Sequence, residues 1–161
     1  MGWTDYLVLL GFIAVCVVAA TSGAIFAPGA WYKSLKKPWW NPPDWLFPVV
    51  WTVLYAFMAI AGWLVWRSAG SFGAAALPLT FFVLQLVLNA AWSAIFFGLK
   101  RMDWALAEVT LLWAAILACI VTFAPFSALA AWLMAPYLLW VTIAAYLNYT
   151  VLKLNRDAVA A

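Results

Sequence analysis

Long apolar runs separated by short polar segments dominate the chain. At a rise of 1.5 Å per residue, a helix of about twenty residues crosses the apolar core of a bilayer. Because backbone polar groups in lipid must be hydrogen-bonded within their own segment, runs of this length predict helices rather than barrel strands. We therefore predict an all-α membrane protein, one domain over residues 1–161. Its five transmembrane helices are expected at about 6–26, 45–66, 76–98, 104–123 and 129–152.

The composition agrees with a protein that crosses the membrane several times. Of 161 residues, 70% are hydrophobic and only 8% are charged, whereas a soluble domain carries about 25% charged residues. A water-soluble monomer of this size could not bury so much apolar surface. The lipid bilayer is therefore the first partner that the sequence predicts.

The basic residues are divided unequally between the two ends of the predicted helices. Under the positive-inside rule, the end richer in Lys and Arg faces the cytoplasm. This places the N-terminus outside and the C-terminus in the cytoplasm, and the short C-terminal tail favours a bacterial cell membrane. The net charge of +3 comes from these loops rather than from a nucleic-acid-binding stripe. The predicted cytoplasmic set is Lys33, Lys36, Lys37, Lys100, Arg101, Lys153 and Arg156, against Arg67 opposite.

Several kinds of chemistry have no support in the sequence. There is no histidine, which removes the commonest general base and metal ligand. No nucleotide-binding or hydrolase motif occurs, and we expect no metal site and no required cofactor. The two cysteines lie in apolar runs, and no two acidic residues are spaced to share a helix face. These residues are Cys16, Cys119, Asp5, Asp44, Asp103, Glu108 and Asp157.

The 13 tryptophans fall into two groups by depth in the predicted helices. Indole rings at span ends are typical of the headgroup region and need no functional explanation. Those deeper in the spans could instead line a site. The first group is Trp3, Trp45, Trp63, Trp66, Trp104 and Trp132, and the second is Trp51, Trp92, Trp113 and Trp140.

A polar stripe runs along the third span. Gln85, Asn89 and Ser93 repeat at i, i+4 and i+8, and Trp92 and Phe96 flank them. Polar side chains in lipid must face protein or a cavity. Interhelical hydrogen bonding and a ligand site explain this stripe equally well.

The deeper tryptophans and the polar stripe are predicted to lie at similar distances below the membrane surface, and so to form one layer. Counted from the predicted cytoplasmic edge, Trp51 and Trp92 lie at about 9 Å, Asn89 at about 14 Å and Trp140 at about 18 Å. Such a layer predicts an aromatic pocket, open toward the first loop, for a large planar ligand. Two residues extend it, namely Tyr55 one turn beyond Trp51 and Ala144 at about 12 Å.

The first loop, residues 27–44, is the only long connection. Pro38, Pro42 and Pro43 fix the backbone and reduce the entropy lost on ordering. Its aromatic and basic residues are explained equally by a lid over the pocket and by an anchor at the headgroups.

Two further features have competing explanations. Glu108 is the only charge inside a span, and it either reaches toward Lys100 and Arg101 or couples to proton movement. The segment 147–153 fits a pattern proposed for cholesterol contact. Its defining residues, Leu147, Tyr149 and Lys153, also suit an ordinary interfacial anchor.

Three sequence blocks, taken together, resemble the TspO/translocator protein family, also called peripheral-type benzodiazepine receptors. They are KPWWNPP at residues 37–43, WTVLY at 51–55 and PYLLW at 136–140. The resemblance implies a five-helix bundle with a central ligand pocket capped by the first loop, commonly as a homodimer.

The same resemblance implies a function and a set of site residues. Family members bind porphyrins such as protoporphyrin IX, and many bind cholesterol and benzodiazepine or isoquinoline ligands, with a regulatory or transport role in tetrapyrrole metabolism and stress response. The alternative is light-dependent porphyrin degradation, for which Trp51 and Trp140 are the candidate residues. The ligand-binding residues expected from the motifs are Tyr32, Pro42, Trp51, Tyr55, Asn89, Trp92, Trp140 and Ala144.

Overall fold

The computed structural model describes residues 2–156, and within them every regular element is a helix. Met1 and residues 157–161, including Asp157, lie outside the described residues. Five helical stretches are long and apolar enough to cross a membrane, which confirms the predicted all-α fold. The elements are α1 (Trp3–Ile25), α2 (Ala30–Ser34), α3 (Leu46–Ala69), α4 (Ala76–Ser93), the π-helix η1 (Ala94–Gly98), α5 (Met102–Phe123) and α6 (Ala128–Leu154).

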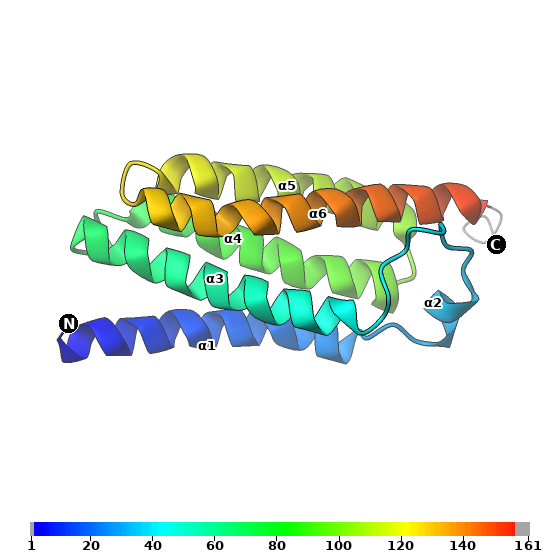
Figure 1. Cartoon of the computed structure of the whole chain (residues 1–161), viewed down its shortest axis with the longest axis horizontal. Coiled ribbons are helices and arrows are strands. Elements are labelled where there is room, and N and C mark those ends of the chain that lie inside the picture. The colour runs from blue at the N-terminus through cyan, green and yellow to red at the C-terminus, as the bar shows by residue number, and fades with distance from the viewer. Residues whose placement is uncertain (1, 157–161) are drawn as a thin grey trace.

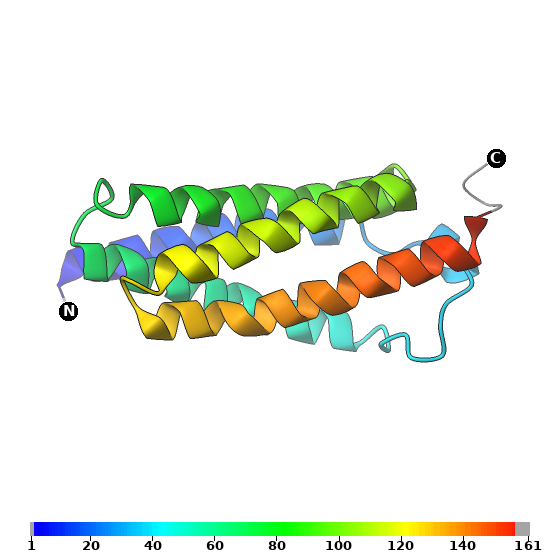
Figure 2. The same cartoon turned by 90° about the horizontal axis from the view of Figure 1, so that it is seen from above.

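The long helices form an elongated bundle in which neighbours along the chain run in opposite directions (Figures 1 and 2). Helix α1 lies at one edge and packs against α3 and α4, while α6 packs against α3 and α5. Helix α4 also packs against α5, and it continues into η1 at the same end of the bundle where α6 ends. Segments from α3, α4 and α6 therefore meet inside the bundle.

Local chemistry fixes where several of these helices begin and end. The Ser127 hydroxyl accepts a hydrogen bond from the N–H of Ala130 and caps the start of α6. Gly70 ends α3 with φ at 77°, a left-handed conformation that glycine adopts without a Cβ clash. At the end of η1, the N–H of Leu99 bonds to the carbonyl of Ala94 at 2.8 Å, one residue wider than an α-helical turn.

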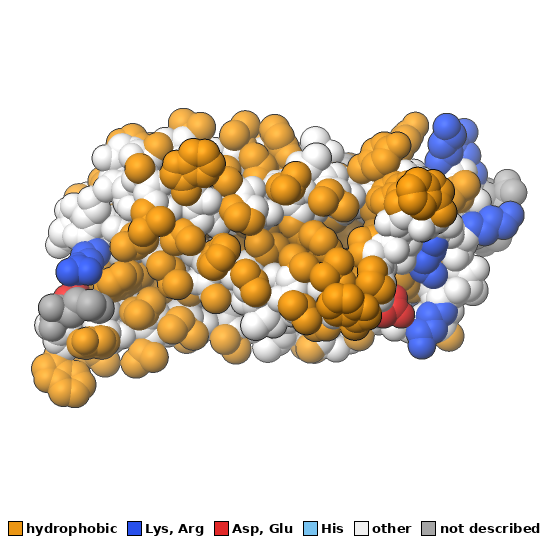
Figure 3. All heavy atoms as spheres, in the orientation of Figure 1, with side chains coloured by type: hydrophobic (Ala, Val, Ile, Leu, Met, Phe, Trp, Pro, Cys, Tyr) orange, Lys and Arg blue, Asp and Glu red, His pale blue; other side chains and the backbone are white. Residues whose placement is uncertain are grey.

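The face of the bundle seen in Figure 3 is apolar along its length, with charged side chains gathered at the two ends. Most predicted interfacial tryptophans are exposed, such as Trp3 and Trp132. Trp63 is different, because it is buried and its Nε1 donates to the carbonyl oxygen of Asp5 at 3.0 Å. Its role is to join α3 to α1, so the prediction that it is an exposed anchor is wrong.

The first loop is more ordered than its sequence predicts. It contains the short helix α2, and it lies beyond the ends of α1 and α3, beside the last turns of α6 (Figure 1). Tyr32 and Leu35 from this loop are buried against the bundle. The loop is therefore a packed part of the structure at the end where α6 finishes.

Candidate ligand-binding site

Three helices contribute one hydrogen-bonded group inside the bundle, which we call the amide triad: Tyr55 from α3, Asn89 from α4 and Tyr137 from α6. The hydroxyl of Tyr55 donates to Asn89 Oδ1 at 2.6 Å. Asn89 Nδ2 donates to the hydroxyl oxygen of Tyr137 at 2.8 Å. Asn89 and Tyr137 are both buried. Of the two explanations for the polar stripe, interhelical hydrogen bonding holds at Asn89, whereas the buried Gln85 amide has no hydrogen-bond partner among residues 2–156.

Trp51 completes an aromatic wall around the amide triad. Its ring lies 5.6 Å from that of Tyr55 and 6.0 Å from that of Tyr137, measured between centroids. The Tyr137 ring meets it edge-on, an arrangement that aromatic pairs favour. The side chain of Trp51 stays half-buried. The structure therefore combines flat apolar faces with polar groups that can orient a ligand.

A second, mainly aromatic group joins the first loop to α4 and η1, and we call it the loop cluster: Tyr32, Leu35, Trp92, Phe96 and Phe97. Trp92 stacks on Phe96 with centroids 4.9 Å apart, and Phe97 meets the Tyr32 ring edge-on at 5.4 Å. Leu35 is buried in the same cluster. Predicted site residues Tyr32 and Trp92 are thus brought together through Phe96 and Phe97.

Tyr32 is held from several sides. Its hydroxyl donates to Asn41 Oδ1 at 3.4 Å, and Lys37 Nζ lies 4.5 Å from its ring centroid. Burial, reinforced by the negative charge of Asp44, raises the pKa of the Tyr32 hydroxyl from 10.0 to about 12. Tyr32 therefore remains a neutral donor at physiological pH. The next predicted residue, Pro42, is half-buried and accepts a hydrogen bond from Asn41 Nδ2 at its carbonyl oxygen.

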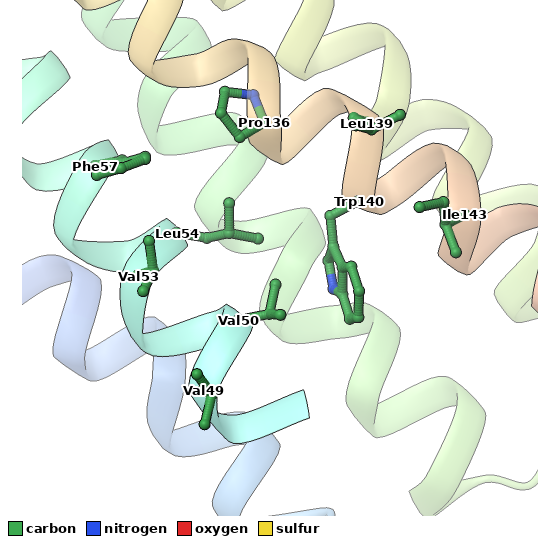
Figure 4. A pocket seen from close by; sticks show the side chains of 9 residues that line it. All are labelled: Val49, Val50, Val53, Leu54, Phe57, Pro136, Leu139, Trp140 and Ile143. Atoms are coloured by element: carbon green, nitrogen blue, oxygen red, sulfur yellow. The ribbon is translucent and has the colours of Figure 1, made fainter. Parts of the chain in front are cut away.

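Trp140 lies on the opposite side of the α3–α6 contact from the amide triad. Its ring meets that of Phe47 edge-on at 5.8 Å, and its side chain points into the space between the two helices (Figure 4). There it lines an apolar groove of about 260 Å³. Pro136, inside α6, also lines this groove. The full lining is Val49, Val50, Val53, Leu54, Phe57, Pro136, Leu139, Trp140 and Ile143.

The four deep tryptophans therefore differ in their surroundings, and Trp113 lies apart from the site, where its Nε1 donates to the Thr142 hydroxyl at 2.9 Å. Trp51 borders the amide triad, Trp92 belongs to the loop cluster, and Trp140 borders the apolar groove. Ala144 is half-buried one turn after Trp140. Tyr137, which the sequence did not place in the site, joins Trp51 to Asn89, since its ring contacts Trp51 and its hydroxyl bonds to Asn89. Its position in the PYLLW block was the available signal.

Glu108 is buried in α5, with 8% of its surface exposed. Among residues 2–156, neither of its carboxyl oxygens has a hydrogen-bond partner. Arg101 pairs with Asp103 instead, through Nε and Oδ1 at 2.8 Å, and its guanidinium covers the Trp104 ring. Of the two explanations for Glu108, its reach toward Lys100 and Arg101 is wrong, because Arg101 pairs with Asp103 and the Glu108 carboxylate is buried without a hydrogen-bond partner among the described residues.

The segment with the cholesterol-contact pattern divides between two environments. Leu147 is buried and packs with the residues of the loop cluster, whereas Tyr149 and Lys153 are exposed. Asn148, next to Leu147, is also buried and donates from Nδ2 to the carbonyl oxygen of Met102. The three residues of the pattern thus share no single face of α6, and sterol contact stays a prediction.

Comparison with known proteins agrees with the resemblance carried by the three sequence blocks. A model of the TspO/MBR family matches residues 12–154. The chain belongs to the TspO/MBR family. A "Tryptophan-rich sensory protein" of Cereibacter sphaeroides is 42% identical over 151 residues, which cover 94% of this chain and 93% of that relative.

Relatives of this family member extend beyond bacteria. The "Translocator protein" of Homo sapiens is 39% identical over 151 residues, covering 91% of this chain and 89% of the human protein. The "Tryptophan-rich protein TspO" of Archaeoglobus fulgidus is 34% identical over 154 residues, covering 94% and 99% respectively. The similarity therefore spans the five long helices as well as the motif blocks.

Proposed function

We propose that this TspO/MBR family member binds porphyrins, such as protoporphyrin IX, where α3, α4 and α6 meet beneath the first loop. The observation that supports the proposal most is the aromatic wall of Trp51, Tyr55 and Tyr137 around the buried Asn89 amide. Flat aromatic faces suit a planar macrocycle, and a few convergent polar groups would fix its orientation.

The distribution of basic residues supports an orientation of the porphyrin in which its carboxylates face the first loop. The lysines of the first loop lie at the end of the bundle that the loop covers, and Lys37 is held above the Tyr32 ring. The carboxylates of protoporphyrin IX would be attracted to this basic end. Its apolar macrocycle would then lie deeper, at the level of the aromatic side chains.

In the cell, we assign the protein a regulatory or transport role in tetrapyrrole metabolism and stress response. The relatives' names, "Tryptophan-rich sensory protein" and "Translocator protein", support sensing and transport respectively. Cholesterol and benzodiazepine or isoquinoline compounds are further proposed ligands. We further propose that the protein is a homodimer in a bacterial cell membrane, with its C-terminus in the cytoplasm. We propose that it requires no cofactor.

Titration of protoporphyrin IX into the detergent-purified protein, followed by tryptophan quenching, tests this function. We expect saturable quenching, and at least a tenfold weaker apparent affinity in Trp51→Phe. Trp132→Phe is the matched control, because Trp132 is exposed on the outside of α6. Quenching that does not saturate, or that is equal in the two variants, would show that the proposed site is not used.

The second candidate is light-dependent porphyrin degradation, with Trp51 and Trp140 taking part. It is favoured by the close succession of oxidisable rings from Trp51 to Tyr55 and Tyr137. Under illumination, porphyrin absorbance should decay faster with the protein than without it, and more slowly in Trp51→Phe. Equal decay with and without protein rules this activity out.

A further inference from the structure

Asn155, the residue that follows α6, bonds to the first loop through both ends of its side-chain amide. Its Oδ1 accepts a hydrogen bond from the main-chain N–H of Lys36 at 2.9 Å. Its Nδ2 donates to the carbonyl oxygen of the same Lys36, also at 2.9 Å. The two residues are 119 positions apart in the sequence. One side chain thus satisfies both main-chain groups of a loop residue, as a neighbouring strand would.

The chemistry of this contact is specific to an amide. A carboxylate of the same length can only accept, and leucine can do neither. Asn155 Nδ2 also donates to the carbonyl oxygen of Val151 at 2.8 Å, one turn earlier in α6. This third bond fixes the amide plane relative to the helix, so that the loop is attached to a rigid element.

A second contact attaches the loop to the same helix. Trp40 stacks on Tyr146 of α6, with ring centroids 5.3 Å apart and planes 14° from parallel. Tyr32 and Leu35, from the same loop, are buried in the loop cluster. The loop is therefore attached to α6 at Lys36 and Trp40 while its apolar residues cover Trp92 and Phe96.

We infer that Asn155 is a positioning residue that holds the first loop over the ligand site. Its bonds to Lys36 must break before the ligand can leave toward the basic end, and this step limits the rate of ligand dissociation. The inference rests on the proposed function, because the ligand is the porphyrin proposed above. Asn155 itself does not touch the residues of the amide triad. Its effect is carried by the loop, which must move before a ligand packed against Trp92 can pass.

Two measurements on the purified full chain test the inference. The first, made without ligand, is hydrogen–deuterium exchange of the Lys36 amide by NMR. The second is the dissociation rate of protoporphyrin IX, followed by recovery of tryptophan fluorescence. In Asn155→Leu, which removes both bonds to Lys36, we expect each rate to rise roughly tenfold, because the main-chain groups of Lys36 lose their partner. The association rate should change much less.

Two further variants make the result specific. Asn155→Asp keeps the acceptor for the Lys36 N–H but loses the donor to its carbonyl, so both rates should rise by a smaller factor. Thr150→Val is the matched control, because the Thr150 hydroxyl bonds only within α6, to the carbonyl oxygen of Tyr146. It should leave both rates unchanged. If Asn155→Leu does not fold, Tyr146→Leu removes the second attachment and should also speed ligand release.

The outcomes separate the inference from the proposed function. Faster exchange at Lys36 with an unchanged dissociation rate would show that the fastened loop does not limit release, and would overturn the inference. Unchanged exchange at Lys36 in Asn155→Leu overturns it as well. A lack of saturable porphyrin binding in the unaltered protein would instead refute the proposed function, and with it the release step.

Discussion

The two sides of the α3–α6 contact differ in chemistry although the same two helices form both. On the inner side, Tyr55 and Tyr137 bond to the amide of Asn89. On the outer side, Trp140 lines a groove whose walls are entirely apolar. The inner side can orient a ligand by hydrogen bonds, whereas the outer side offers only shape and apolar contact.

This difference arises from what surrounds each side. The inner side is closed by α4, so a polar group there must find a protein partner. The outer side faces away from the bundle, and its exposed residues, such as Val53 and Leu139, suit contact with lipid. Four substitutions test how far the two sides differ in their contribution to stability.

Asn89→Leu should have the largest effect on the inner side. It leaves the hydroxyl groups of Tyr55 and Tyr137 without their partner inside the bundle, at about 1–3 kcal/mol for each buried unsatisfied group. We expect a loss of about 2–4 kcal/mol in the free energy of unfolding, measured by thermal or denaturant unfolding in detergent. Thr110→Val is the control, because its hydroxyl bonds only to Leu106 of its own helix. Equal unfolding midpoints for Asn89→Leu and Thr110→Val would contradict a structural role for the amide triad.

Tyr137→Phe should have an intermediate effect, of about 1–2 kcal/mol, because it leaves Asn89 Nδ2 without an acceptor. Tyr55→Phe should be milder, since Tyr55 is only half-buried and water or a ligand can replace it. The same unfolding measurement ranks the two variants. A larger loss for Tyr55→Phe would mean that the α3 contact, rather than the α6 contact, dominates the triad.

Leu139→Ala should have the smallest effect, within about 0.5 kcal/mol, because Leu139 lies on the exposed wall of the apolar groove. Unfolding in the same detergent provides the measurement. A loss above about 1 kcal/mol would show that the groove wall is packed in the folded protein. In that case the outer side would contribute to stability as the inner side does.

Much of the fold could be predicted from the sequence because the relevant signal is local. The predicted spans agree with the helices to within a few residues, as with 76–98 against α4 and η1. The short helix α2 was not predicted, since five residues show no useful periodicity. The burial of Trp63 was also missed, because a tryptophan near a helix end has the same sequence context whether it faces lipid or Asp5.

The candidate site could be predicted only in part. The stripe through Asn89 pointed to the correct face of the third span, but nothing local to it indicated Tyr55 or Tyr137 as partners. For Glu108, proximity along the chain favoured Arg101, and the structure pairs Arg101 with Asp103 instead. These outcomes depend on how each helix is rotated, and helices that are apolar on all sides carry no amphipathic pattern to reveal it.

The sequence by itself determined that this protein has five membrane-length helices and belongs to a recognisable family. It could do so because in lipid each segment must satisfy its own backbone, so that length and apolar composition suffice. Only the tertiary structure decided that Trp51, Trp92 and Trp140 have three different surroundings, and that Asn155 holds Lys36 across 119 residues. Such contacts depend on the relative rotation and register of separate helices, which no single segment specifies.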